Sequence, residues 1–324
     1  MARVDNIRNV AVAGTGVMGP GIALSFARAG YAVWLWGRTE ASVGRGQAGL
    51  DHDGQALVSF DLASQAEIDA ARQRITLTTD LAAAGSQADL VVETIIENFA
   101  AKQALFRQLD AVCPPYTILT TDTSGLPITS VTSVVERGAL AVGTHFWNPP
   151  YLMPLVEVVK GERTSQDTFD ITCRVIESIG KRPVRVLKDL PGFLGNRLLH
   201  TLWREALALV EHGVASPEDV DLIARYTFGM RMPPAGIFDI MDIVGLDLIQ
   251  SIHEYLFAEL DRRTSPSPVT TQLIEEGRLG AKAGQGFYEW KPGDAQAWRD
   301  ARDAEIVRHA SRLLDRGLIH KPQP

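Results

Sequence analysis

The chain has 324 residues, enough for one large domain or two ordinary ones, and its 45% apolar and 22% charged residues are typical of a globular protein. Its formal net charge of −7 argues against a nucleic-acid partner, because binding to phosphates needs clustered Lys and Arg. Only two cysteines occur, no apolar run reaches about 18 residues, and no signal peptide is recognisable, so we expect a cytoplasmic protein without disulfides, metal or membrane contact.

The first 190 residues alternate short apolar runs of strand length with segments of helical periodicity. Strands are expected at residues 7–14, 32–37, 89–96, 117–122, 140–146, 155–159 and 183–188. Helices are expected at residues 20–30, 40–74, 99–112 and 165–179. Strands that alternate with helices predict an α/β fold, with a parallel, doubly wound sheet of the Rossmann type.

The texture of the sequence changes near Pro191. Helical periodicity dominates from Leu194 onward, as in residues 196–213 and 216–229, and the charged tail at 295–317 is amphipathic. We therefore expect three parts in chain order: a Rossmann-type domain at residues 1–190, an all-α C-terminal domain at 191–292, and an appended helix at 293–324.

A glycine-rich turn, 14-GTGVMG-19, follows the first expected strand and opens the first expected helix. Gly14 would allow the tight turn, Gly16 would let a pyrophosphate approach backbone N–H groups, and Gly19 would let helix and strand pack closely. Val17 and Met18 lie in the same turn. The position of the motif between strand and helix predicts a dinucleotide site, the alternative being a glycine turn without a ligand.

The end of the second strand differs from the usual NAD pattern. An acidic residue there normally binds the adenosine ribose, whereas this sequence has Gly37 followed by Arg38. No carboxylate repels a 2′-phosphate, and Arg38 can pair with one, so NADP acceptance is suggested beside NAD. Alternatively, Arg38 stacks on adenine or lies in solvent.

An apolar segment, 143-GTHFWNPPYLMPLVEVV-159, contains one imidazole and one carboxylate, His145 and Glu157. Histidine is the side chain whose ordinary pKa suits a general base near neutral pH, and a nearby carboxylate orients it. Two prolines reverse the chain between them. This pairing predicts an acid–base site, the alternative being a core histidine and a surface glutamate.

Several segments in register resemble the L-3-hydroxyacyl-CoA dehydrogenase family over residues 6–290. They are 14-GTGVMG-19, 93-ETIIEN-98, 122-DTSGLPIT-129, 145-HFWNPPYLMPLVEVV-159, 190-LPGFLGNRLL-199 and 279-LGAKAGQGFY-288. The resemblance implies an NAD(P)-dependent oxidoreductase of fatty acid metabolism that interconverts an (S)-3-hydroxyacyl substrate and its 3-oxo form. It also implies a homodimer formed through the C-terminal domain.

The same resemblance assigns roles to individual residues. His145 would be the general base and Glu157 its partner, while Ser124 and Asn196 would bind the reacting oxygen. Cofactor contacts are implied for Glu97, Lys102, Ser124, Asn148 and Lys282. The sequence departs from the family at Asp122, Gly125 and Ile237, where Asn, Ser and Pro are common, which puts the outer groups of the substrate in doubt.

Two kinds of substrate remain possible, a CoA thioester and a free acid. A CoA site normally offers Lys or Arg, yet residues 50–74 carry five acidic side chains against Arg72 and Arg74. A free hydroxy acid or a hydroxymethyl- or formyl-pyridine carboxylate is therefore the alternative substrate. A non-catalytic scaffold protein related to lens crystallins is a further alternative, which retention of His145 and Glu157 argues against.

Overall fold

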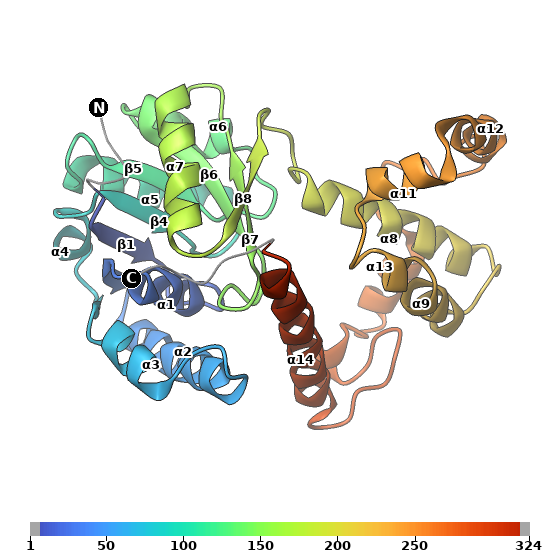
Figure 1. Cartoon of the computed structure of the whole chain (residues 1–324), viewed down its shortest axis with the longest axis horizontal. Coiled ribbons are helices and arrows are strands. Elements are labelled where there is room, and N and C mark those ends of the chain that lie inside the picture. The colour runs from blue at the N-terminus through green and yellow to red at the C-terminus, as the bar shows by residue number, and fades with distance from the viewer. Residues whose placement is uncertain (1–6, 318–324) are drawn as a thin grey trace. The chain divides into compact units, whose positions relative to one another are not determined.

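The computed structural model describes residues 7–317, which form two compact units (Figure 1). Among the described residues, unit 1 contains 7–196 together with 303–317. Unit 2 contains residues Arg197–Arg302. Unit 1 holds the sheet and unit 2 is helical, so the predicted α/β class with a helical C-terminal region is confirmed.

An eight-stranded sheet forms the centre of unit 1, in the order β3-β2-β1-β4-β5-β6-β7-β8. The strands are β1 (Asn9–Ala13), β2 (Ala32–Trp36), β3 (Ile75–Thr78), β4 (Leu90–Glu93), β5 (Ile118–Thr121), β6 (Ala141–Phe146), β7 (Leu155–Val159) and β8 (Arg182–Val186). The first six strands in this order pair in parallel, as a Rossmann sheet requires. β7 is antiparallel to β6, because a short loop rather than a crossover helix joins them.

Helices cover both faces of this sheet (Figure 1). One face carries α1 (Gly19–Arg28), α2 (Glu40–Ser59), α3 (Gln65–Arg72) and α7 (Gln166–Ser178), and the other carries α4 (Leu81–Gly85), α5 (Phe99–Val112) and α6 (Ile128–Val131). Side chains of β1 alternate between the two apolar layers, with Val10 and Val12 on the α1 side and Ala11 and Ala13 on the α5 side. Burial of both faces explains why the strands read as continuous apolar runs.

The prediction of one helical segment at residues 40–74 is wrong in one respect, because these residues form two helices, α2 and α3. The break falls at residues 60–64, where Asp61 has a left-handed φ of 57° and Ser64 caps α3 in a reciprocal bond with Glu67. β3 was not expected, because its four residues at the sheet edge contain only two apolar side chains. The strand expected at 89–96 ends at Glu93, whose Oε1 accepts the Ile95 N–H and turns the chain.

Unit 2 is built from helices. They are α8 (Gly195–Glu211), whose first residues belong to unit 1, then α9 (Pro217–Tyr226), α10 (Phe228–Arg231), α11 (Ile237–Val244), α12 (Leu246–Leu256), α13 (Pro268–Glu275) and the first part of α14 (Asp294–Asp315). Across residues 7–317, none of the helices combines the length and apolar character needed to cross a membrane.

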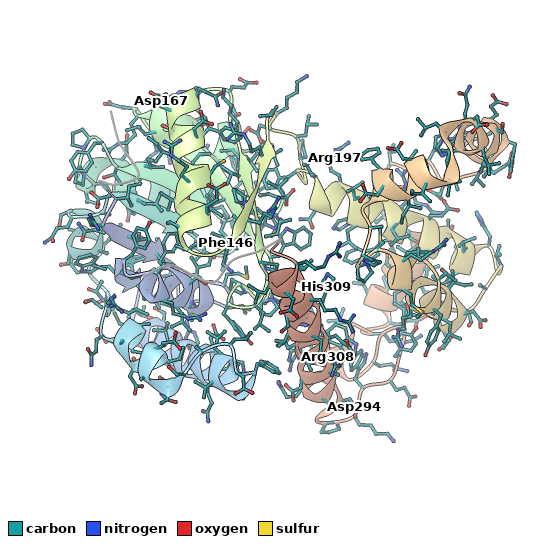
Figure 2. The ribbon with its side chains drawn as sticks, viewed as in Figure 1. Phe146, Asp167, Arg197, Asp294, Arg308 and His309 are labelled. Atoms are coloured by element: carbon teal, nitrogen blue, oxygen red, sulfur yellow. The ribbon has the colours of Figure 1, made fainter. Side chains whose placement is uncertain are left out.

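The expected tail helix at 295–317 is present as α14, and its second part belongs to unit 1. Ile306 and Val307 pack against the apolar layer on the α1 side of the sheet, and Ala310 is buried. Arg308 and His309 on the same helix are labelled in Figure 2. The amphipathic pattern of the tail therefore serves to attach it to the Rossmann unit.

Candidate active site

The glycine-rich turn between β1 and α1 has room for a ligand at one glycine and none at the other two. A Cβ on Gly14 would lie 2.4 Å from the Thr94 carbonyl oxygen, and one on Gly19 would lie 1.9 Å from the Gly14 carbonyl oxygen. Gly14 also has a φ of 140°, which favours glycine. A Cβ on Gly16, in contrast, would point into open space, where a pyrophosphate can approach the backbone.

The N-terminus of α1 provides the matching electrostatics. No side chain caps this helix and no acidic residue lies in its first turn, whereas Thr39 caps α2 and Asn98 caps α5. Free backbone N–H groups and the positive end of the helix dipole favour an anion. Val17, in the same turn, is 79% exposed. The turn therefore fits the pyrophosphate of a dinucleotide.

Gly37, at the end of β2, is closed to any larger residue. A Cβ there would lie 2.6 Å from Ser42 Oγ and 3.0 Å from Thr15 Cγ2. Close packing of α2 against the glycine turn therefore explains the missing carboxylate at this position. Arg38 is exposed directly after it.

His145 and Glu157 face each other across the antiparallel pair β6–β7. Directly opposite residues project to the same side of a sheet, and His145 Nδ1 lies 2.7 Å from Glu157 Oε2. His145 is 5% exposed and Glu157 is 2% exposed. The reversal of the chain at residues 147–154 thus brings the imidazole and its carboxylate together in a dry environment.

The second oxygen of Glu157 binds the start of α8. Oε1 accepts the backbone N–H groups of Leu194 and Gly195, at 2.9 and 3.0 Å. Burial raises the pKa of Glu157, but the hydrogen bonds from His145, Gly195 and Leu194 outweigh it, and the pKa lies below its ordinary value. Glu157 is therefore ionised at neutral pH, and His145 Nδ1 donates to it.

Two aromatic rings enclose the imidazole. The rings of Trp147 and Phe193 lie 5.1 and 5.8 Å from that of His145, measured between centroids. Phe193 is 1% exposed, and it has a left-handed φ of 50° at the turn into α8. Both residues lie inside segments quoted above, 145-HFWNPPYLMPLVEVV-159 and 190-LPGFLGNRLL-199, but no pattern in the sequence indicates their contact with His145.

Ser124 and Asn196, expected to bind the reacting oxygen, are brought together. Asn196 Nδ2 donates to the Ser124 carbonyl oxygen at 2.6 Å. The Ser124 N–H donates to Glu97 Oε1 at 3.1 Å, and the same oxygen accepts Thr123 Oγ1 at 2.5 Å. Glu97 thus fixes the loop after β5 that carries Ser124. Thr123 lies inside the segment 122-DTSGLPIT-129, but the sequence alone does not predict its role, because a threonine can have many roles.

Lys102 lies behind Glu97. Its ammonium group is 2.8 Å from Glu93 Oε1 and 3.4 Å from Glu97 Oε2, and the side chain is 1% exposed. Thr121 Oγ1 also donates to Glu93, at 2.6 Å. The structure therefore places Lys102 where it can hold Glu97, and a direct cofactor contact of Lys102 stays a prediction.

The remaining two expected cofactor residues are exposed. Asn148 lies in the loop between β6 and β7, three residues after His145. Lys282 belongs to unit 2, in a short 3-10 turn at Ala281–Ala283. Their roles stay predictions. Among residues 7–317, no group of three or more His, Cys, Asp or Glu side chains is arranged to hold a metal ion.

Comparison with known proteins gives relatives over most of the chain. The 5-formyl-3-hydroxy-2-methylpyridine 4-carboxylate 5-dehydrogenase of Mesorhizobium japonicum is 35% identical over 301 residues, which cover 93% of this chain and 96% of that protein. A probable 3-hydroxybutyryl-CoA dehydrogenase of Bacillus subtilis is 38% identical over 290 residues, covering 88% and 98%.

A solved structure is similar to the whole fold. It is a crystal structure of a 5-formyl-3-hydroxy-2-methylpyridine 4-carboxylic acid 5-dehydrogenase, described as an NAD⁺-dependent dismutase. It matches with a TM-score of 0.88 and 34% identity, and covers 95% of this chain and 98% of that one.

Two family models match in succession. Residues 9–190 match the NAD-binding domain of 3-hydroxyacyl-CoA dehydrogenase, and residues 192–290 match its C-terminal domain. The matches cover the glycine turn, the His145–Glu157 pair and the start of α8. The chain therefore belongs to the 3-hydroxyacyl-CoA dehydrogenase family, a family of NAD-dependent oxidoreductases.

Proposed function

We propose that the protein interconverts an (S)-3-hydroxyacyl substrate and its 3-oxo form, with His145 as the general base. The observation that carries this proposal is the hydrogen bond of 2.7 Å between His145 Nδ1 and Glu157. Both residues are buried, on the adjacent strands β6 and β7. With Nδ1 donating to a carboxylate, the neutral imidazole has its lone pair on Nε2. Nε2 is then the atom that removes the proton of the substrate hydroxyl.

Glu157 supports the protonated product of that step. An ionised carboxylate beside the imidazolium offsets the cost of its charge in a water-poor site. NAD supplies the complementary chemistry when bound, since it accepts a hydride from the carbinol carbon. The family establishes the use of NAD, and the turn Gly14–Gly19 with its open Gly16 would hold the pyrophosphate.

Ser124 and Asn196 complete the proposed site. One N–H of the Asn196 amide holds the Ser124 carbonyl, which leaves a second N–H on the same nitrogen for the reacting oxygen. Glu97 fixes the backbone of Ser124, and Lys102 neutralises Glu97 from behind. Asn148 and Lys282 are proposed as further cofactor contacts on the strength of the family pattern alone.

Replacing His145 with Gln tests the base. His145→Gln should lower kcat by about 10²–10⁴-fold, the usual contribution of general acid–base catalysis, and leave NAD binding nearly unchanged. His52→Gln is the matched control, because the His52 side chain is 67% exposed and lies on α2. Steady-state kinetics with NAD titration gives both values. Near-full turnover by His145→Gln would remove this residue from the mechanism.

A free acid is the second candidate for the substrate. At the end of α3, Arg72 Nη2 is 2.8 Å from Asp51 Oδ1 of α2. Just after α3, Arg74 Nη1 donates to the carbonyl oxygen of Ala70. Both arginines of this acidic segment therefore already have partners within the protein. This arrangement weakens the case for a CoA phosphate site there.

A relative supports the same candidate. The pyridine carboxylate dehydrogenase structure matches this chain with a TM-score of 0.88, and the substrate in its name carries a ring carboxylate rather than a thioester.

Inhibition by CoA decides whether the substrate is a CoA thioester or a free acid. If the charge argument holds, free CoA and acetoacetyl-CoA should inhibit poorly, while 3-hydroxy acids and pyridine carboxylates should be turned over. Initial rates with a panel of both substrate classes measure this. Micromolar inhibition by CoA that Arg72→Ala or Arg74→Ala relieves would contradict the charge argument and assign the thioester.

NADP acceptance remains our proposal for the nucleotide site, beside the use of NAD. Gly37 and Ser42 leave no room for a carboxylate, and the exposed Arg38 can pair with a 2′-phosphate. Arg38→Ala should therefore lower kcat/KM for NADP by about tenfold and leave that for NAD unchanged. Arg107→Ala, exposed on α5, is the control. A strong NAD preference that Arg38→Ala does not alter would contradict a role for Arg38.

Unit 2 supports the proposal of a homodimer. None of the residues of α10, α11 and α12 is buried. Large apolar residues of α11 are among the most exposed, since Phe238 is 78% exposed and Ile243 is 89% exposed. Apolar surface of this extent on one unit is costly in water unless a partner covers it. A second copy of the chain is the partner that we propose.

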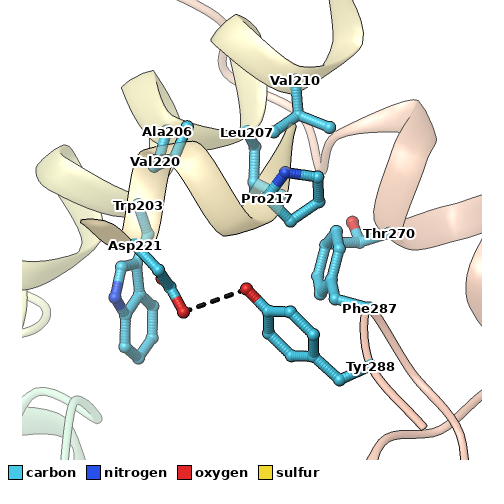
Figure 3. Close-up of a pocket in the computed structure, with 10 residues that line it drawn as sticks. All are labelled: Trp203, Ala206, Leu207, Val210, Pro217, Val220, Asp221, Thr270, Phe287 and Tyr288. Carbon is cyan, nitrogen blue, oxygen red and sulfur yellow. Dashed lines mark hydrogen bonds between the residues drawn. The ribbon is translucent and has the colours of Figure 1, made fainter. Parts of the chain in front are cut away.

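A pocket within unit 2 adds to the apolar surface available for that partner (Figure 3). Its volume is about 320 Å³, and its wall includes Trp203, Leu207 and Phe287. One polar contact crosses it, from Tyr288 Oη to Asp221 Oδ2 at 3.0 Å. An apolar side chain from an exposed helix of the second copy suits such a lining.

Oligomeric state is the test of this proposal. Sedimentation velocity should show a dimer for the native chain and a monomer for Phe238→Asp, because a buried charge at an apolar interface is unfavourable. Tyr116→Asp, at an exposed aromatic residue of unit 1, should remain dimeric. A native monomer, or a Phe238→Asp variant that stays dimeric, would contradict the assignment of this surface.

A cytoplasmic location and a role in fatty acid metabolism are also proposed. The location is supported by Cys113 and Cys173, which are both free and buried, as expected in a reducing compartment. The metabolic role is supported by the family alone. Fractionation of the source cells and growth on fatty acids would test them.

A further inference from the structure

Asp122 is a buried carboxyl group between the two halves of the proposed site. It follows β5 directly and is 8% exposed. Its Oδ1 accepts the backbone N–H of Phe146 at 2.8 Å, and its Oδ2 is 3.0 Å from Thr94 Oγ1. Phe146, labelled in Figure 2, is the residue next to His145 and the last of β6.

On the side of the base, Asp122 replaces a missing backbone partner. The pairing of β5 with β6 ends at Thr121 and Gly143, so the part of β6 that carries His145 has no strand beside it on that edge. β7 holds the opposite edge through the pairs at His145 and Phe146. The carboxyl of Asp122 therefore fixes the end of β6 from the side that the sheet leaves open.

On the side of the cofactor, Asp122 is hydrogen-bonded to Thr94, which packs against the glycine-rich turn. Thr94 follows β4, and its N–H donates to the Ala13 carbonyl oxygen at 2.9 Å. The carbonyl oxygen of Thr94 lies against Gly14, where it excludes any Cβ. One side chain thus connects the strand that carries the base with the residue against which the dinucleotide turn packs.

We propose that Asp122 is a positioning residue for the reaction, which sets His145 relative to the glycine turn. The proposal rests on the proposed role of His145 and goes beyond it. The group acts through Phe146 and Thr94, not by touching substrate. Its effect should therefore appear in kcat, since a small misplacement of reacting groups lowers the rate steeply.

The protonation of Asp122 fits this role. Burial raises its pKa to about 8, against the lowering effects of Phe146, Thr94 and Lys102, while the nearby Glu93 adds to the rise. At neutral pH the carboxyl mostly keeps its proton. Oδ1 accepts the N–H of Phe146, and Oδ2 accepts the hydroxyl of Thr94. An asparagine amide can keep the first bond through its oxygen and replace the second by donating its N–H to Thr94 Oγ1.

Three variants separate positioning from simple stabilisation. Asp122→Ala should lower kcat by about 10²-fold at a temperature where the variant is folded, and Asp122→Asn should restore it close to the native value. Asp89→Ala is the matched control, because Asp89 also accepts backbone N–H groups, from Arg8 and Asn9, but at the amino end of the central strands β1 and β4. Asp89→Ala should lower the Tm and leave kcat unchanged.

Other results of these measurements would overturn the proposal. Full kcat in folded Asp122→Ala, or equal kinetic effects of Asp122→Ala and Asp89→Ala, would overturn the proposal. If Asp122→Ala does not fold, Thr94→Val, which removes the bond to Asp122 Oδ2, should lower kcat more than it raises the KM for NAD, and unchanged kinetics would overturn the proposal. His145→Gln measured in parallel distinguishes this failure from failure of the proposed function itself.

The pH dependence of stability tests the neutral carboxyl without any activity assay. An aspartate ionises near pH 3.8 in the unfolded chain and near 8 in the folded protein, so the native chain loses stability as pH rises between these values. Asp122→Asn lacks this titration. Its Tm relative to the native chain should therefore increase from about pH 4 to about pH 8, and a constant difference would contradict a buried neutral carboxyl.

Discussion

The carboxylate of Glu157 is the group on which the rest of the site depends. One of its oxygens holds Nδ1 of His145, and the other accepts two backbone N–H groups at the start of α8. A buried carboxylate with three donors stays ionised, so the imidazole and the helix start are fixed by the same charge. Asn196, one residue after Gly195, is thereby held close to Ser124, to which it is hydrogen-bonded.

The reversed strand β7 makes this arrangement possible. In a purely parallel sheet, two residues twelve positions apart would not stand opposite each other, because a crossover helix would lie between them. The short loop at residues 147–154 instead places His145 and Glu157 in direct register. Gly14, Gly16 and Gly19 lie at the carboxyl end of the neighbouring parallel strands, where Rossmann sheets bind their ligands.

Much of this could be predicted from local patterns. Apolar runs identified seven of the strands, the glycine spacing identified the turn, and the isolated polar residues identified His145 and Glu157. Partners set by tertiary packing escaped the sequence. Nothing in it indicates that Lys102 lies between Glu93 and Glu97, or that the residue behind Gly37 is Ser42. A departure from the family marked Asp122, but only the structure shows its bonds to Thr94 and Phe146.

The tautomer of His145 tests the central claim most directly. The chain contains seven histidines, and ¹⁵N NMR of the histidine-labelled protein, compared with His145→Gln, isolates the signals of this one ring. The account predicts a proton on Nδ1 and a bare Nε2 in the neutral native ring, and loss of this preference in Glu157→Ala. A native ring protonated on Nε2, or a spectrum that Glu157→Ala does not change, would contradict it.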